Sequence, residues 1–331
     1  MGKENRRQQT SSGTGAVPAE FDDATVWAAW MYYVDELTQS EIAEIVGVSR
    51  VTVIKMLQEA RDRGVVSIRI NTEIASRAQL ARELAHTFNL DAATVIPDGN
   101  DDALVRRLGE AAALVLADAI KEGDIIGVAW GRTVLEAARA ISLPGPIDSL
   151  TVVQVAGSST GTSTTAFSPE LCSSLLANRL SAHCVNLLTP ALLSTAALRD
   201  QLLAESSIQK QFSIIRSANR ILFGVGDVGP GSTVRQAELL DNDTIDGFCA
   251  SGAVAAIISR FIGPDGEPMS GAIHDRMIGI TLDELKTIPY RLCVAGGRRK
   301  ITAVLAALRG GYATNLITDA STARSLIEAN G

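Results

Sequence analysis

The sequence predicts an α/β protein in which a small N-terminal helical domain is followed by a larger, doubly wound parallel sheet. Three observations lead to this prediction. The chain has 331 residues, which is longer than one typical domain. It is 46% hydrophobic but only 4% aromatic, which suits a core of Ala, Val, Leu and Ile. After residue 90, apolar runs alternate with segments of helical periodicity, as in a parallel sheet covered on both faces.

Residues 1–23 are predicted to form a disordered arm. The opening MGKENRRQQTSSGTGAVPAE is polar and rich in Ser and Gly, and it lacks the apolar core of a secretory signal. Apolar runs such as AAALVLADAI are interrupted by a charge well before the ~18 residues of a membrane span. The four cysteines (Cys172, Cys184, Cys249, Cys293) form no C-x-x-C pair and no cluster with histidine. We therefore expect no zinc site, no disulfide framework, no cofactor, and a reduced cytoplasmic setting.

Residues 24–72 are predicted to form three helices. Apolar residues recur at helical spacing from Ala24 to Glu36. Thr38 and Glu41 form a capping box at the start of a second helix, which ends at Gly47. Ser49 caps a third helix that ends near Gly64, with an inward face of Val53, Met56, Leu57 and Ala60. The alternating VVSIRI of residues 65–70 predicts a strand that could form a small wing.

This three-helix segment has the residues of a helix-turn-helix. Small, turn-forming and apolar residues stand where two helices must meet at a fixed angle: Gln39, Ala43, Gly47, Val48, Ser49 and Val53. We expect the start of the third helix to enter the major groove with Arg50, Val51, Thr52 and Lys55. Thr38, Gln39 and Ser49 could bind phosphates. The alternative is an ordinary three-helix interaction module.

The charge distribution supports local rather than global contact with nucleic acid. The whole chain carries a net charge of -7, whereas proteins that coat nucleic acid are basic. Residues 50–69 hold five basic residues (Arg50, Lys55, Arg61, Arg63, Arg69) and two acidic ones (Glu59, Asp62). The positive charge is therefore concentrated in and after the third helix.

Residues 73–90 are predicted to be a linker helix, and residues 91–331 a doubly wound domain. Its strand and helix segments alternate as ATVIP, DALVRRLGEAAALVLADAI, DIIGVAWG, RTVLEAARAI, LTVVQVAG, PELCSSLLANRL, HCVNLL, ILFGVG, RLCVAGG, KITAVLAALRG, NLITD and STARSLIEAN. In such sheets a ligand binds beyond the carboxyl ends of the strands.

Several polar residues are expected at that edge. Trp130, Gly131, Arg132 and Thr133 stand between a strand and a helix, where free N–H groups favour an anion. Gly296, Gly297 and Lys300 have the same context. Gln154 and Gly157 follow another strand, and Asp275 and Arg276 precede the apolar stretch 278–281, read as a strand. Each could instead be structural: a helix cap, a solvated basic turn, a buried amide or a surface ion pair.

A dinucleotide site is the rival interpretation for residues 224–229. They satisfy G-x-G-x-x-G after an apolar strand, and Asp246 follows about 20 residues later. Pro230 and Gly231 come where the phosphate-binding helix should already run, and proline disrupts a helix interior. We therefore read Gly224 and Gly226 as part of a glycine-rich loop beside the ligand cleft.

The chain resembles bacterial transcriptional regulators of the SorC/DeoR type, which respond to sugars. The resemblance rests on YYVDELTQSEIAEIVGVSRVTVIKMLQEARDRGVVSIRI, GDIIGVAWGRT, PALLSTAALRDQLL, ILFGVGDVG and RMIGITLDELKTIPYRLCVAGGRRKITAVLAALRGGYATNLITDASTA, and covers roughly residues 25–328. It implies an effector domain of the phosphosugar-isomerase type and a homo-oligomer, dimer or tetramer. It also implies operator DNA and a sugar, sugar phosphate or polyol as partners. Lys300 matches the family's effector-side lysine.

The sequence departs from the family at residues 252–262. Many members read GAVGDI followed by a Phe-Asp pair, whereas this chain has Ala256 and Ile262 at the two aspartate positions. The change favours an effector that is smaller or less polar than a typical sugar phosphate. The Ser/Thr-rich GSSTGTSTTAFSP could be a mobile lid or a disordered loop. An active isomerase or deaminase remains the alternative, but His86, His183 and His274 stand in no evident constellation for a general base.

Overall fold

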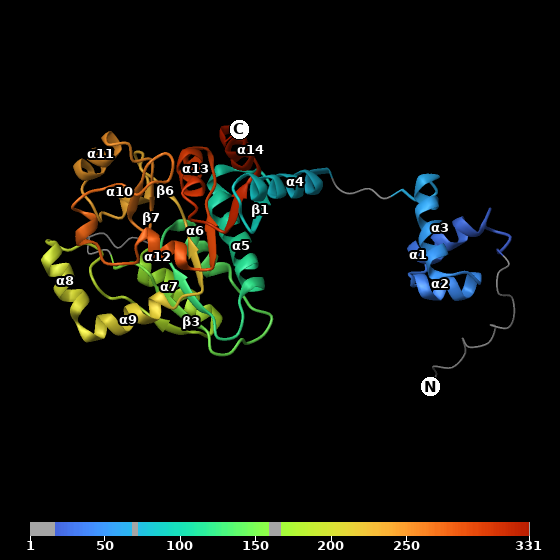
Figure 1. Ribbon diagram of the computed structural model, residues 1–331, viewed down its shortest axis with the longest axis horizontal. Helices are drawn as coiled ribbons and strands as arrows, with labels where there is room; N and C mark the ends of the chain where they lie inside the picture. Colours follow the sequence, from blue (N-terminus) through green and yellow to red (C-terminus); the bar gives the residue numbers. More distant parts are fainter. Residues whose placement is uncertain (1–16, 68–71, 159–166, 331) are drawn as a thin grey trace. The chain divides into compact units, whose positions relative to one another are not determined.

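The computed structural model describes residues 17–67, 72–158 and 167–330, which fall into two compact units, residues 1–71 and 72–331 (Figure 1). Most of the predicted arm, residues 1–16, lies outside the described residues, and so does most of the Ser/Thr-rich loop, residues 159–166. Residues 18–21 form a turn, in which the Phe21 N–H donates to the Pro18 carbonyl at 3.0 Å. Of the predicted strand 65–70, residues 65–67 are not a strand, and 68–70 lie outside the described residues.

The first unit contains the three predicted helices, and the second and third have the predicted caps. They are α1 (Ala24–Tyr33), α2 (Gln39–Val46) and α3 (Arg50–Asp62). The Asp23, Thr38 and Ser49 side chains accept hydrogen bonds from the first-turn N–H groups, and Thr38 and Glu41 complete the capping box. Gly47 ends α2 at φ 75°, a conformation that costs a glycine little. Ile42, Val53 and Ala60 are fully buried between the helices.

The second unit is built on a seven-stranded sheet, all of whose neighbouring strands are parallel. The strands are β1 (Ala92–Ile96), β2 (Ile125–Val128), β3 (Thr151–Gln154), β4 (His183–Val185), β5 (Arg220–Phe223), β9 (Tyr290–Val294) and β10 (Asn315–Asp319). Their order across the sheet is β1-β10-β9-β5-β2-β3-β4. The strands β3 and β4 follow β2 on one side, and β9 and β10 follow β5 on the other. The predicted doubly wound α/β fold is therefore confirmed.

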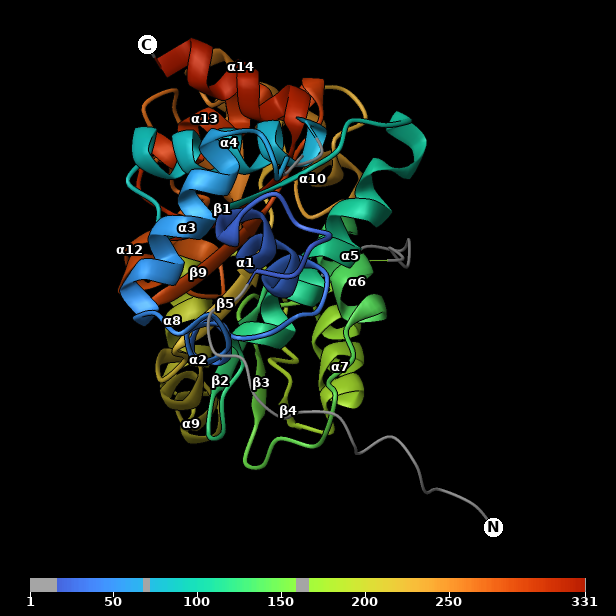
Figure 2. The ribbon, with the colours of Figure 1, turned by 90° about the vertical axis from the view of Figure 1, so that its right-hand side faces the viewer.

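Helices cover both faces of this sheet, as Figure 2 shows. One face carries α5 (Asp101–Ala119), α6 (Arg132–Ala140) and α7 (Pro169–Leu180). The other carries α4 (Thr72–Thr87), α9 (Ser206–Arg216), α12 (Leu282–Thr287), α13 (Ile301–Arg309) and α14 (Ala320–Asn330). Successive strand residues serve opposite faces: Val152 packs with the first group and Val153 with the second.

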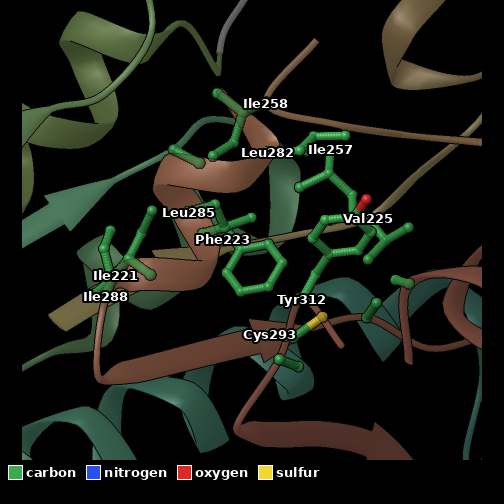
Figure 3. Packing of buried hydrophobic residues seen from close by; sticks show 14 of the residues in the cluster. Ile221, Phe223, Val225, Ile257, Ile258, Leu282, Leu285, Ile288, Cys293 and Tyr312 are labelled. Atoms are coloured by element: carbon green, nitrogen blue, oxygen red, sulfur yellow. The ribbon is translucent and has the colours of Figure 1, made fainter. Parts of the chain in front are cut away.

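The larger of the two sheet cores gathers around the ring of Phe223 on β5 (Figure 3). Leu285 of α12, Cys293 of β9 and Tyr312 surround it, and all four side chains are fully buried. Burying a side chain of this size contributes about 1.5–3 kcal/mol. The Tyr312 hydroxyl donates to the Gly266 carbonyl at 2.7 Å, so its polar atom is not left unpaired. Burial raises the pKa of Cys293 to about 12, so this thiol stays protonated.

A small antiparallel sheet projects beyond the carboxyl ends of the large one, and it was not predicted. It consists of β6 (Gly226–Asp227), β7 (Ala255–Ile257) and β8 (Arg260–Ile262), in that order. The helices α10 (Thr233–Gln236) and α11 (Asn242–Ala250) pack on it around Ile245 and Phe261. The helices α8 (Ala196–Ala204), α9 and α12 were also missed. The predicted strand at 278–281 is wrong: the backbone there makes a single isolated bridge, between Gly279 and Ala156.

The helix α4 belongs to the second unit. Leu84 is fully buried in the core that α4 shares with β1 and α14. The predicted linker 73–90 is therefore helical up to Thr87, and its C-terminal half packs in the core of the second unit. Among the described residues no helix is both long enough and apolar enough to span a bilayer.

Candidate functional site

The outward face of α3 carries the residues that were expected to reach DNA bases. Arg50, Val51, Thr52 and Lys55 are all exposed, because Val53 and Leu57 turn the opposite face of the helix into the core. Val51 is 63% exposed. Ile54, one turn further, is 44% exposed and was not predicted. Apolar groups in this position can contact the thymine methyl group.

Arg50 is held in place by Gln39. The Arg50 Nε donates to the Gln39 Oε1 at 3.3 Å, which joins the start of α3 to the first turn of α2. The two terminal nitrogens of Arg50 have no hydrogen-bond partner among the described residues. They are therefore available for a bidentate contact, such as the one that arginine makes with the O6 and N7 of guanine.

The two capping hydroxyls are already engaged inside the unit. The Thr38 Oγ1 donates to the Glu41 Oε2 at 2.7 Å, and the Ser49 Oγ accepts from the Thr52 N–H at 3.1 Å. The bond from Thr38 lowers the pKa of the Glu41 carboxyl group. A phosphate at these positions would therefore meet mainly the exposed N–H groups of the helix starts.

The positive patch is smaller than the residue count suggested. Arg63 forms ion pairs with Asp23 at 2.6 Å and Glu59 at 3.5 Å, and Arg61 donates to the Tyr33 hydroxyl at 3.0 Å. Arg69 lies outside the described residues. On the described surface of α3, Arg50 and Lys55 are therefore the cations that remain open to a phosphate or a base.

A cavity of about 570 Å³ opens at the carboxyl ends of β2, β5 and β9. A cavity of this size accommodates a small molecule, and its place is the one expected for a ligand in a doubly wound fold. Its lining includes nine of the predicted ligand residues: Trp130, Gly131, Arg132, Thr133, Gly224, Gly226, Gly296, Gly297 and Lys300.

The N-terminus of α6 forms one side of this cavity. Gly131 precedes the helix at φ 128° and provides no side-chain cap, so the first N–H groups are open to an anion. The Thr133 hydroxyl donates to the Val294 carbonyl at 3.2 Å. The exposed Arg132 donates to the Gln236 amide of α10, and its guanidinium lies 5.7 Å above the Phe167 ring.

The loop between β9 and α13 forms the opposite side. Gly297, at φ 95°, donates its N–H at 2.8 Å to both the Asp319 Oδ2 and the Thr322 Oγ1. The Lys300 Nζ donates to the Val225 carbonyl at 2.8 Å. Burial lowers the pKa of Lys300, and the Asp227 carboxylate partly opposes that shift. When protonated, the Lys300 amine has two further N–H donors for a ligand.

The glycine-rich loop after β5 forms the third side. A Cβ on Gly226 would lie 2.9 Å from Val234, and one on Gly224 would lie 3.3 Å from the Thr133 hydroxyl. The chain then enters β6 and the four-residue α10, capped by Ser232. No phosphate-binding helix starts within the described loop, so this geometry does not fit the dinucleotide interpretation.

A strained hairpin turn also lines the cavity. Ile258 and Ser259, between β7 and β8, have φ values of 50° and 64°. Non-glycine residues in this left-handed region cost roughly 1–2 kcal/mol each. Such strain concentrates at functional sites.

Four predicted ligand residues do not line the large cavity. The buried Gln154 donates its amide N–H groups to the carbonyls of Ala156 at 2.7 Å and Leu187 at 3.1 Å. It is therefore the buried structural amide that was the alternative to a ligand contact. Gly157 packs against the Ala191 backbone, which leaves no space for a Cβ. Asp275 and Arg276 lie in a 3-10 turn (His274–Arg276), where Arg276 donates to the Ser194 carbonyl.

Other lining residues were missed. They are Leu104, Val105, Val225, Asp227, Gly231, Ser232, Thr233, Val234, Ala256, Ile258, Ser259, Arg298 and Arg299. Ala256, which replaces the family's first aspartate, lies on the cavity wall opposite Gly226. Asp227 stands in the quoted GVGDVG, but its place in the cavity depends on the pairing of β6 with β7, about 30 positions later.

Both units have relatives among known proteins. Residues 72–328 match the family model described as "Putative sugar-binding domain", and residues 30–83 match a Crp-like helix-turn-helix domain. The transcriptional regulator YjhU of Escherichia coli (strain K12) is 34% identical over 317 residues, covering 92% of this chain and 94% of that protein. The deoxyribonucleoside regulator of Bacillus subtilis (strain 168) is 31% identical over 315 residues, covering 93% and 98%.

Solved structures share the same architecture. The full-length sorbitol operon regulator SorC from Klebsiella pneumoniae superposes with a TM-score of 0.72 at 25% sequence identity, covering 92% of this chain and 97% of that one. A domain of a possible sugar-binding transcriptional regulator from Arthrobacter aurescens TC1 gives a TM-score of 0.67 at 24% identity, covering 76% and 97%.

Proposed function

The chain belongs to the SorC-type family of sugar-binding bacterial transcriptional regulators, and on this premise we propose that it represses a carbohydrate or polyol catabolic operon under the control of a small effector. Residues 24–72 bind double-stranded operator DNA. Residues 91–331 bind the effector and hold the oligomer together. The observation that carries the proposal is the cavity at the carboxyl edge of the sheet, in a chain that also has an exposed recognition helix.

The chemistry of the cavity supports an effector with one anionic group and a hydroxylated body. The open N–H groups at the start of α6, together with Arg132 and Lys300, favour an anion such as a phosphate. Asp227, Ser232 and Ser259 add acceptors and donors for hydroxyl groups. Val234, Ala256 and Ile258 form an apolar wall. Sugars, sugar phosphates and polyols combine these features.

Binding without turnover is the simpler account of this cavity. Isomerases and deaminases of phosphosugars need a base positioned on the substrate. None of the three histidines lines the cavity, and Asp227 is its one carboxylate among the described residues. Incubation with sugar phosphates, followed by detection of isomerised or deaminated product, tests this part of the proposal. A product formed by the wild type and lost in Asp227→Asn would establish the enzyme instead.

We further propose that the regulator acts as a homo-oligomer on a pseudo-palindromic operator. One copy offers only Arg50 and Lys55 as open cations on the described surface of α3, and few phosphate contacts give weak binding. Helix-turn-helix proteins commonly place two copies on half-sites one helical turn apart. The effector then shifts the equilibrium between conformations of the oligomer, by no more than its own differential affinity for them.

The test is a mobility-shift titration of the full chain against its own upstream region, with a scrambled duplex of equal length as the control. A specific complex is expected, and a matching sugar or sugar phosphate should dissociate or alter it. If the upstream and scrambled duplexes bind equally at every salt concentration, the regulator proposal is wrong. The neighbouring genes guide the choice of sugars.

A further inference from the structure

Asp227 occupies an unusual position in the cavity. Its carboxylate is the one acidic group that lines the cavity among the described residues, and the other charged lining residues are Arg132, Arg298, Arg299 and Lys300. A site that bound only an inorganic anion would gain nothing from a negative charge beside its cations. The carboxylate therefore indicates a second function within the cavity.

The backbone fixes the direction of this carboxylate. Asp227 lies on β6, paired with Ala255 of β7, and its Oδ1 accepts from the Gly229 N–H at 3.1 Å. The Oδ2 accepts no hydrogen bond from the described residues. A carboxylate with one oxygen hydrogen-bonded by the backbone and the other open can accept hydrogen bonds from ligand hydroxyl groups.

The wall of the cavity next to the Asp227 carboxylate is apolar. Ala256 on β7, paired with Gly226 on β6, lines the cavity with a methyl group. Val234 and Ile258 extend that apolar surface. Along this wall, Asp227 is thus the charged acceptor available to a ligand, while Lys300 and the start of α6 serve the anionic end.

We propose that Asp227 is the specificity-determining residue of the effector cavity: it accepts hydrogen bonds from hydroxyl groups of an effector that carries one anionic group, and it disfavours a bare anion or a second phosphate. This inference rests on the proposed effector-binding function. Its physical basis is that a hydroxyl donates to the carboxylate, whereas a phosphate close to it is repelled.

The experiment compares wild type with Asp227→Asn in the full chain. Thermal unfolding and calorimetry are measured with inorganic phosphate, sn-glycerol 3-phosphate, D-ribose 5-phosphate, D-glucose 6-phosphate and D-fructose 1,6-bisphosphate. Asparagine is isosteric and can still accept the Gly229 N–H, so the unfolding temperature without ligand should not change. Asp246→Asn is the matched control, because Asp246 pairs with Arg235 and does not line the cavity.

In Asp227→Asn the Kd of the best hydroxylated monophosphate should rise roughly tenfold to a hundredfold, the loss expected for a hydrogen bond to a charged group. The Kd values of inorganic phosphate and of the bisphosphate should stay equal or fall, and Asp246→Asn should match the wild type. Should Asp227→Asn unfold early, Asp227→Ser takes its place.

The outcomes separate the inference from the function on which it rests. If no compound stabilises the wild type, the proposed effector binding is wrong and the inference falls with it. If the wild type binds a sugar phosphate and Asp227→Asn binds it equally well, only the inference is wrong. A parallel loss of phosphate and sugar phosphate would likewise overturn it, because Asp227 would then merely shape the cavity.

Discussion

Replacing Arg50 by alanine should weaken binding to the operator without weakening binding to random DNA. In the structure the Arg50 Nε donates to Gln39. The two terminal nitrogens of its guanidinium group are therefore left to bond the edge of a base. A bidentate contact of this kind discriminates between bases by about 1–3 kcal/mol. The Kd for one half-site should therefore rise by roughly 5-fold to 150-fold. On a two-fold symmetric operator bound by two copies, the free-energy loss should double.

The assay is fluorescence anisotropy with the upstream duplex and with a scrambled duplex, each at several salt concentrations. Arg50→Ala should leave the salt dependence unchanged, because a base contact releases no phosphate counterion. Lys55→Gln should instead reduce the slope of log K against log salt by about 0.9 for each bound copy. Gln39→Ala should resemble Arg50→Ala but with a smaller loss, since it removes only the group that orients the guanidinium.

Arg61→Ala is the control within the same helix, because Arg61 already donates to Tyr33 and Gln58. It should bind both duplexes nearly as the wild type does. An equal loss on both duplexes for Arg50→Ala would show that Arg50 contacts a phosphate. No loss on either would refute the assignment of this face to DNA.

Substitutions at three further positions test other parts of the structure. Lys300→Met should abolish the rise in unfolding temperature caused by a sugar phosphate while leaving operator binding intact; an undiminished rise would exclude Lys300 from the site. Asp124→Ala should lower the free energy of unfolding by about 3–5 kcal/mol in urea titrations, because it leaves the half-buried Arg220 without its ion pair. Burial opposes ionisation of Asp124, but hydrogen bonds from Arg220, the Lys121 N–H and Asn219, with the charge of Arg220, together outweigh burial and lower its pKa. Its contribution to stability is therefore present above the unfolded value of ~3.9 and is lost as pH falls through the folded value; equal wild-type and mutant pH profiles below pH 5 would contradict this. Gly47→Ala should cost about 1–2 kcal/mol through its φ of 75° alone, since its Cβ would meet open space, and Gly47→Asn should cost less.

The elements defined by local signals were predictable from the sequence. Thr38 with Glu41, Ser49, and the glycine at 47 fix three helix ends by hydrogen bonds within four residues or by one backbone angle. The strands of the large sheet are continuous apolar runs between helical segments. The glycines next to basic residues at 131 and 297 both line the cavity.

Features that depend on distant contacts could not be predicted in the same way. The strands β6, β7 and β8 have two or three residues each, and the pairing of β6 with β7 joins segments about 30 positions apart. Gln154 was placed at the right edge of the sheet, but the Ala156 and Leu187 carbonyls that occupy its amide come from the folded chain. The ion pairs of Arg63 likewise involve Asp23, 40 positions earlier, so a residue count overstated the positive charge of α3.

The buried carboxylate of Asp319 connects the cavity to the helix that follows the DNA-binding unit in the chain. One of its oxygens holds the Gly297 N–H in the cavity loop, and the other holds the Thr322 N–H at the start of α14. The helix α14 shares its core with α4, which begins at Thr72, directly after the first unit. An effector that takes the Gly297 N–H for itself must break one arm of this clamp. The loop that lines the cavity and the start of a helix that packs with α4 are therefore held by one carboxylate.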